Sequence, residues 1–178
     1  MLRLRPYKPC DAAVILKWIR DEEALRKWSA DRFGAYPVTA ENMNYRYVKC
    51  NGECAETDNF YPMTAFDDQG VAGHFILRYT DDKKSTLRLG FVIVDDRRRG
   101  QGLGREMLRL AARYAFDLFG AERITLGVFE NNPAAHRCYL AAGFRDIPGA
   151  ENAYPIMGQQ WKCLEMEMRT PSARSGNP

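Results

Sequence analysis

The sequence predicts one mixed α/β domain built on a mainly antiparallel sheet. Three apolar stretches separated by short polar turns, at residues 60–66, 71–79 and 86–94, are typical of an antiparallel meander. The third stretch continues through a glycine-rich loop into a long amphipathic helix. A chain of 178 residues with 46% apolar and 28% charged content can bury one substantial core.

The segment before the meander is expected to supply a first strand and two helices. Residues 2–6 alternate in polarity and end at a proline, as edge strands do. From Asp11, which we expect to be an N-cap, apolar residues recur at helical spacing as far as Trp28. A second helix is expected to begin at Thr39 and to end at Asn51-Gly52.

After the meander, the long helix is expected to reach Phe119 and to end at Gly120. Residues 124–129 are almost continuously apolar, which suits a strand buried on both faces. Asn132 is a predicted N-cap, and the helix that it opens should end at Gly143.

Two further strands, at residues 144–147 and 161–168, should complete the sheet. We expect the domain to span residues 1–169. The tail at residues 170–178 has nothing to bury and is expected to be mobile.

The central feature is the loop between the third meander strand and the long helix, which reads Arg99-Gly100-Gln101-Gly102-Leu103-Gly104. Its glycines let a ligand approach the backbone, and free N–H groups at the start of a helix attract anions. Arginines at positions 97–99 add positive charge, so a phosphate or pyrophosphate is the expected ligand. The same pattern also occurs for purely geometric reasons, and the dinucleotide fingerprint and the Walker motif are both absent.

At this loop the sequence resembles a known family. Arg99-x-x-Gly102-x-Gly104, after an apolar strand and before an amphipathic helix, looks like the acetyl-CoA-binding motif of the GNAT superfamily of acyl-CoA-dependent N-acetyltransferases. A second block, which runs from Asn132 through Ala135 and Tyr139 to Gly143-Phe144, is similar to the family pattern N-x-x-A-x-x-x-Y-x-x-x-G-F. The N-terminal segment is similar to the subgroup that acetylates ribosomal-protein N-termini and small amines. The resemblance implies a sheet splayed after the third meander strand, with helices on both faces.

The resemblance also implies where acetyl-CoA binds. Backbone N–H groups of the glycine loop would hold the pyrophosphate, assisted by arginines at positions 97–99 and 105. A bulge in the strand before the loop would free its backbone to pair with the pantetheine arm, and one N–H there would face the thioester carbonyl. The implied cofactor-binding residues are Val92, Ile93, Val94, Arg99, Gly100, Gln101, Gly102, Leu103, Gly104, Arg105 and Asn132.

Tyr139 is the implied general acid, which would protonate the departing CoA thiolate. From the pattern alone it is a core residue, since it shares an apolar helical face with Ala135 and Ala142. Asn132, similarly, is either an N-cap only or an N-cap that also contacts pantetheine.

The general base is not assigned by the sequence. An aliphatic amine with a pKa near 10.4 is neutral in only about one molecule in a few thousand at pH 7. Many relatives carry a glutamate where this chain has Arg88 or Gly127. Glu130, a chain of water molecules, an acidic residue between positions 53 and 58, and His74 remain candidates.

The acceptor pocket is expected at the segments that vary in the family, here residues 28–36 and 154–161. Both are aromatic and carry few acidic groups, which disfavours a polyamine acceptor. The implied activity is acetyl transfer from acetyl-CoA to a primary amine of a small molecule or of a peptide or protein N-terminus. A non-catalytic acyl-CoA-binding module or sensor is the alternative, because the family glutamates are missing.

Composition also limits which partners and which cellular compartment are expected. A net charge of +3, without a basic stripe of interleaved aromatic residues, argues against nucleic acid as a partner. No signal-peptide pattern and no run long enough to span a bilayer are present, and five scattered cysteines suit reduced thiols. We therefore expect a cytoplasmic monomer or homodimer with no membrane partner. Cys50 and Cys54 lack a second ligand pair, so no metal is expected.

Overall fold

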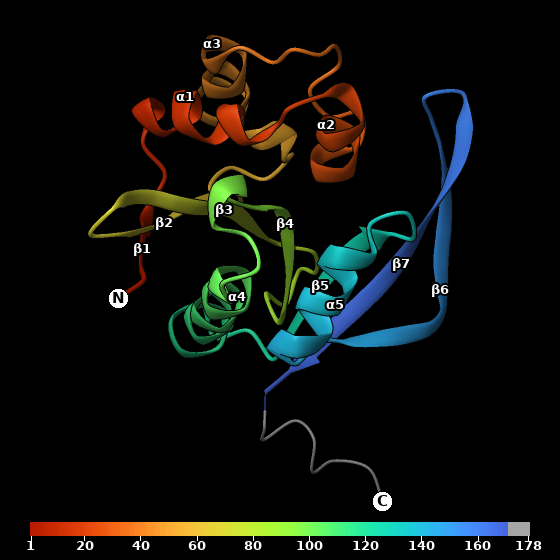
Figure 1. The fold of residues 1–178 in the computed structure, drawn as a ribbon. Coiled ribbons are helices and arrows are strands. Elements are labelled where there is room, and N and C mark those ends of the chain that lie inside the picture. The colour runs from red at the N-terminus through yellow and green to blue at the C-terminus, as the bar shows by residue number, and fades with distance from the viewer. Residues whose placement is uncertain (171–178) are drawn as a thin grey trace, which may run out of the picture.

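The computed structural model describes residues 1–170. Within them one seven-stranded sheet has the order β1-β2-β3-β4-β5-β7-β6, and its β4–β5 pair is parallel while the other pairs are antiparallel (Figure 1). The strands are β1 (Arg3–Pro6), β2 (Tyr61–Asp67), β3 (Gly70–Tyr79), β4 (Thr86–Val94), β5 (Arg123–Phe129), β6 (Arg145–Ile156) and β7 (Gln159–Arg169). The predicted mixed α/β fold with a mainly antiparallel sheet is confirmed.

Helices cover both faces of this sheet, as Figure 1 shows. The α-helices are α1 (Ala12–Ile15), α2 (Glu22–Ser29), α3 (Ala40–Asn44), α4 (Leu103–Arg113) and α5 (Pro133–Ala142). Shorter helical turns are η1 (Pro9–Asp11), η2 (Leu16–Trp18), η3 (Tyr45–Lys49), η4 (Asn51–Glu53), η5 (Asp96–Arg98) and η6 (Tyr114–Leu118).

Alternation along the central strands explains the two layers. On β3, Phe75 and Leu77 are fully buried in the core that α4 and α5 close, while Ile76 between them belongs to the core that α1, α2 and α3 close. A strand with apolar residues at successive positions therefore needs helices on both of its faces, and the sequence supplies them.

The sheet opens between β4 and β5. The two strands pair only at residues 86–88 of β4 and 123–125 of β5. Beyond this point β4 carries a bulge opposite Phe75, where Phe91 adopts a positive φ of 50°, and the register to β3 shifts. The second half of β4 consequently has no partner on its β5 side, which produces the expected splay.

Local capping determines the helix ends that the sequence predicted correctly. The Asn132 side chain accepts a hydrogen bond from the N–H of Ala135 at 3.3 Å, and α5 ends before Gly143, which adopts a φ of 110°. Thr39 caps α3 in the same way through the N–H of Asn42 at 3.1 Å. These short-range interactions need no information from distant parts of the chain.

The continuous helix predicted from Asp11 to Trp28 is wrong. The chain forms η1, α1 and η2, breaks, and begins again at α2, whose N-cap is Asp21. The Asp11 carboxylate accepts from the preceding Lys8 N–H at 2.9 Å, from Thr64 at 2.7 Å and from both terminal nitrogens of Arg5. Asp11 thus occupies the predicted N-cap position of α1, but its side chain makes no capping bond to that helix and instead anchors the helical layer to β1 and β2.

The strand predicted at residues 144–147 is much longer, because β6 extends to Ile156 as the outer strand of a long hairpin with β7. The backbone N–H of Thr170 donates to the carbonyl of Glu122 at 3.1 Å. The rest of the predicted mobile tail lies outside the described residues. Within residues 1–170, no helix has the length and apolar character needed to cross a membrane.

Candidate functional site

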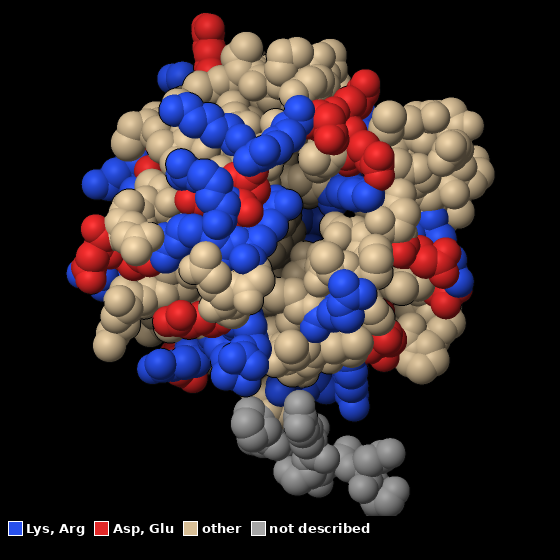
Figure 2. Space-filling model, viewed as in Figure 1, with Lys and Arg blue, Asp and Glu red and all other residues tan. Residues whose placement is uncertain are grey.

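A cleft of about 1100 Å³ lies beside the second half of β4, where that strand has left β5, and is also lined by the glycine loop, α4, α5 and α2. Figure 2 shows it as a dark hollow near the centre of the molecule, with lysine and arginine atoms along its rim. All the predicted site residues line this one cleft: Val92, Ile93, Val94, Arg99, Gly100, Gln101, Gly102, Leu103, Gly104, Arg105, Asn132 and Tyr139. Sequence positions almost fifty residues apart are thus brought to one place.

One end of the cleft is formed by the N-terminus of α4. Gly102 is the N-cap residue with a φ of 80°, a conformation that favours glycine, and no side chain caps the helix. The first N–H groups of α4 therefore have no side-chain acceptor. Glycine at position 104 is explained by packing, because a Cβ there would lie only 3.0 Å from the Cys138 sulfur of α5.

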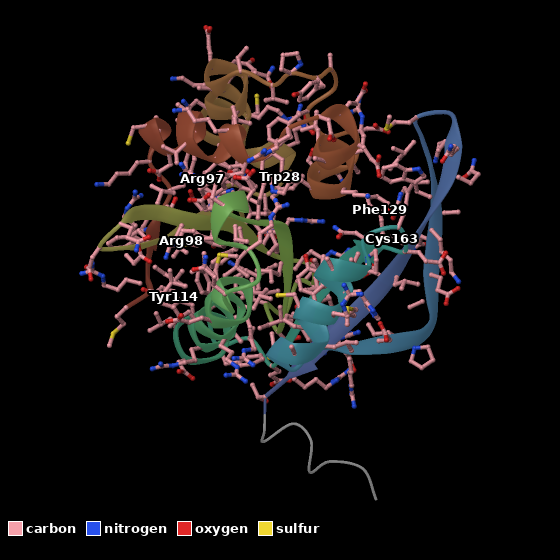
Figure 3. All side chains as sticks on the ribbon, in the orientation of Figure 1. Trp28, Arg97, Arg98, Tyr114, Phe129 and Cys163 are labelled. Atoms are coloured by element: carbon pink, nitrogen blue, oxygen red, sulfur yellow. The ribbon has the colours of Figure 1, made fainter. Side chains whose placement is uncertain are left out.

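The arginines near the loop divide into two groups. Arg97 is paired with Asp95 at 3.2 Å, and Arg98 is paired with Asp67 on β2 (Figure 3). The Arg98 pair fastens the loop to β2, whereas the Arg97 pair lies within the loop itself. Arg99 and Arg105 are exposed, line the cleft, and make no ion pair with a described residue. Only this second group has its full charge available to a ligand.

The wall of the cleft is the unpaired edge of β4. Ile93 and Val94 pair with His74 and Gly73 of β3 on one side, but no β5 residue pairs with them on the other. Backbone groups that point toward β5 are consequently free to bond with an extended ligand, as a strand would.

Tyr139 lies on α5, facing the cleft. It is 8% exposed, its ring packs edge-on against Phe144 at 6.2 Å, and its hydroxyl makes no hydrogen bond with a described residue. Burial, with smaller contributions from the Cys138 and Cys163 thiols, raises the pKa of Tyr139 well above its ordinary value. The phenol therefore stays protonated at neutral pH and can donate a proton.

Two of the candidate bases lie away from the cleft. His74 is fully buried, and its Nε2 lies 2.9 Å from the Tyr47 hydroxyl oxygen. Burial lowers the pKa of His74 to about 3, so this imidazole is a structural group. Glu130 lies 4.0 Å from the amine of Lys162 and is not part of the cleft lining.

The two carboxylates that line the cleft already have partners within α2. Asp21 accepts the N–H of Ala24 at 2.7 Å, and Glu23 pairs with Lys27 at 2.6 Å.

Sequence reasoning missed Glu165. The resemblance leads us to expect a glutamate in place of Arg88 or Gly127, and the structure places the Glu165 carboxylate of β7 beside both residues. Arg88 forms two hydrogen bonds with it, one of them 2.9 Å long. The ladder register of β5 and β7 sets Glu165 opposite Gly127, a relationship that no local motif records.

Of the two predicted acceptor segments, residues 28–36 reach the cleft, whereas none of residues 154–161 lines it. Trp28 of α2 lines the cleft and packs against Phe91 at 5.4 Å. Across the space, Phe129 and Cys163 belong to a cluster with Trp161 on the β5–β7 side (Figure 3). In the described residues 1–170, no three histidine, cysteine or acidic side chains are grouped so as to hold a metal ion.

The comparisons with known proteins agree with this geometry. The spermine/spermidine N(1)-acetyltransferase of Bacillus subtilis (strain 168) is 37% identical to this chain over 65 residues, which cover 36% of this chain and 43% of that protein. The crystal structure of spermidine N-acetyltransferase from Vibrio cholerae in complex with CoA and spermine has a TM-score of 0.77 at 19% identity. The superposition covers 94% of this chain and 95% of that chain. At that identity the likeness establishes the fold.

The profile of the acetyltransferase (GNAT) family matches residues 22–144, the segment that contains α2, the splayed strands, the glycine loop and α5. This match extends over well more than half of the 178 residues, and the chain therefore belongs to the acetyltransferase (GNAT) family.

Proposed function

We propose that this protein transfers an acetyl group from acetyl-CoA directly to a primary amine of a small molecule or of a peptide N-terminus. The main support for this proposal is that one cleft combines the uncapped N-terminus of α4, the free edge of β4 and the protonated Tyr139. The matched segment is less than half of the Bacillus relative, so the activity is assigned from the site and the family together.

Each part of the cleft suits one part of the cofactor. The first N–H groups of α4, with Arg99 and Arg105, bind the pyrophosphate. The β4 edge at residues 92–94 binds the pantetheine amides, and the Asn132 side chain lies at the opposite wall. Acetyl-CoA supplies the activated thioester.

The chemistry then uses groups of the chain at the bulge. A β4 N–H stabilises the negative charge that develops on the thioester carbonyl oxygen, and the Tyr139 hydroxyl donates its proton to the sulfur that leaves. Because Asp21 and Glu23 are engaged, and His74, Glu130 and the acidic residues at positions 53–58 do not line the cleft, we infer that the site takes up the amine in its neutral form. The observed rate should then rise with pH toward the pKa of the acceptor.

Calorimetric titration with acetyl-CoA, followed by a thiol-release assay with amines and N-terminal peptides, tests this proposal. Spermine and spermidine belong in the panel because the relatives are named for them. Binding with CoA release on one acceptor supports the transferase. Binding without release across the panel supports a non-catalytic acyl-CoA-binding module, and absence of binding overturns the assignment of the cleft.

A further inference from the structure

A second hollow of about 570 Å³ lies on the other side of the β4 bulge, under η3 and η4. Gly90 and Phe91 line this hollow, while Val92, the next residue, lines the larger cleft. A molecule seated in the smaller hollow therefore lies next to the part of β4 where the proposed thioester is held. This hollow is well placed to receive the acceptor.

Its lining is rich in arginine, with side chains from Arg32, Arg46, Arg78 and Arg88. Two of these have partners: Arg46 pairs with Glu53 at 2.7 Å, and Arg88 pairs with Glu165. The side chains of Arg32 and Arg78 make no hydrogen bond and no ion pair with any described residue.

Arg78 is the more unusual of the two. It is half-buried on β3, and the strand register places it directly opposite Arg88 of β4. Like charges directly opposite each other in a ladder destabilise a sheet. Burial lowers the pKa of Arg78; the nearby Cys54 thiol opposes this, and the charges of Arg88 and Arg32 add to it.

The acidic residues of the hollow do not supply that counter-ion. Asp81 accepts hydrogen bonds from the Ser85 N–H at 2.9 Å and from the Ser85 hydroxyl at 3.1 Å, so its carboxylate stabilises the turn between β3 and β4. Glu56 and Asp82 are exposed at the rim, where water solvates them, and form no ion pair with a described residue.

We propose that this hollow binds an anionic group of the acceptor, a carboxylate or a phosphate, through Arg78 and Arg32. The inference rests on the proposed function and narrows it: the substrate is a small molecule that carries a primary amine at one end and an anion at the other. Along β4, two to four residues separate Arg88 from residues 90–92, a span of about 7–13 Å of strand, so a short chain can join the two ends of such an acceptor. A second ammonium group, as in a polyamine, would meet uncompensated arginines in this position.

Matched amine pairs test the proposal. We suggest 4-aminobutanoate, 5-aminopentanoate and 6-aminohexanoate against alkylamines of equal length, lysine against cadaverine, and 2-aminoethylphosphonate against ethylamine, with spermidine as the polyamine. For each pair, kcat/KM and equilibrium binding to the CoA-bound protein are measured. The phosphonate pair distinguishes a phosphate-type anion from a carboxylate.

The same pairs are measured on Arg78→Gln, with Arg109→Gln as the matched control. Arg109 is an exposed arginine of α4 and lines neither hollow. For at least one pair, we expect the wild-type kcat/KM of the anionic amine to exceed that of its uncharged-tail partner by about tenfold or more. Arg78→Gln should lose this preference and Arg109→Gln should keep it. Because Arg78 has no partner to lose, the melting temperature of Arg78→Gln should not fall.

Equal or absent binding and turnover for both members of every pair overturns the inference, as does an anion preference that survives in Arg78→Gln. Preferred acetylation of spermidine also overturns it while leaving the acetyltransferase function intact. If acetyl-CoA itself does not bind, the proposed function fails first, so the two failures are distinguishable.

Discussion

The Glu165 carboxylate on β7 lies over Gly127 of β5, 3.2 Å from the point that a Cβ at Gly127 would occupy. The same point lies 2.7 Å from Nη2 of Arg88 and 2.8 Å from the Cys163 sulfur. Side chains from the two neighbouring strands, Arg88 of β4 and Glu165 and Cys163 of β7, thus fill the space that a side chain at position 127 would take. The absence of a side chain at Gly127 is what allows Arg88 and Glu165 to pair across β5.

Gly127→Ala should therefore break this pair. Its methyl group displaces Arg88 and Cys163, and we expect a destabilisation of about 1–3 kcal/mol, or a fall in Tm of roughly 2–12 °C by calorimetry. Gly90→Ala is the matched comparison, because its Cβ would meet only Ile76, at 3.3 Å, and should cost less. Equal Tm values for Gly127→Ala and the wild type would contradict the packing described above.

Arg99→Gln and Arg105→Gln should each weaken acetyl-CoA binding about 2–10-fold, because both side chains lose a charge-assisted contact to phosphate. The loss should shrink as the salt concentration rises, since the side chains are exposed. Calorimetric titration at low and high salt measures this. Arg109→Gln, one helical turn beyond Arg105, is the control, and an equal loss there would indicate a general effect of net charge.

Tyr139→Phe should reduce turnover by roughly a hundredfold or more while leaving acetyl-CoA affinity within about twofold. The phenylalanine ring keeps the packing against Phe144, so Tm should stay close to the wild-type value. Thiol release and calorimetry on one sample separate the two effects. An unchanged rate on a good acceptor would make Tyr139 a core residue without a chemical role.

The stability of the protein should fall as the pH drops below about 6.5, because His74 is neutral when buried and becomes charged when the chain unfolds. Its folded pKa of about 3 lies below the unfolded value, so its contribution is complete above pH 6.5 and is lost progressively toward pH 3. The slope from this one group is at most about 1.4 kcal/mol per pH unit.

Urea denaturation at several pH values measures that slope, and His74→Gln should flatten it. His136, the only other histidine, lies near the surface beside Asp146, and His136→Gln serves as the control. If the slope persists in His74→Gln, another buried group is responsible for it.

The sequence predicts those features that short-range chemistry decides. Asn132 and Gly143 delimit α5 through caps within a few residues, and the glycine loop lies where the motif indicates. The helix from Asp11 failed because apolar spacing continues across a break, while the Asp11 carboxylate has partners on β1 and β2. Such partners cannot be read from a helical pattern.

The charged groups at the splay were beyond sequence reasoning for a related reason. Arg88 meets Glu165 across 77 positions, and it faces Arg78 only because of one specific strand register. A shift of a single residue would turn these side chains to the other face of the sheet. The sequence shows that the glutamates expected from the resemblance are missing at Arg88 and Gly127. It does not show that the Glu165 carboxylate lies beside these positions.

The short β4–β5 ladder has one more consequence. Because only residues 86–88 join β4 to β5, the sheet contains two internal strand edges with unsatisfied backbone groups, the kind of surface that proteins normally cover to prevent self-association. A ligand in the cleft covers the β4 edge and ties the β4 side of the opening to α5 on the other side. By mass action, the supply of that ligand inside a cell would set how much of the chain persists as unaggregated protein.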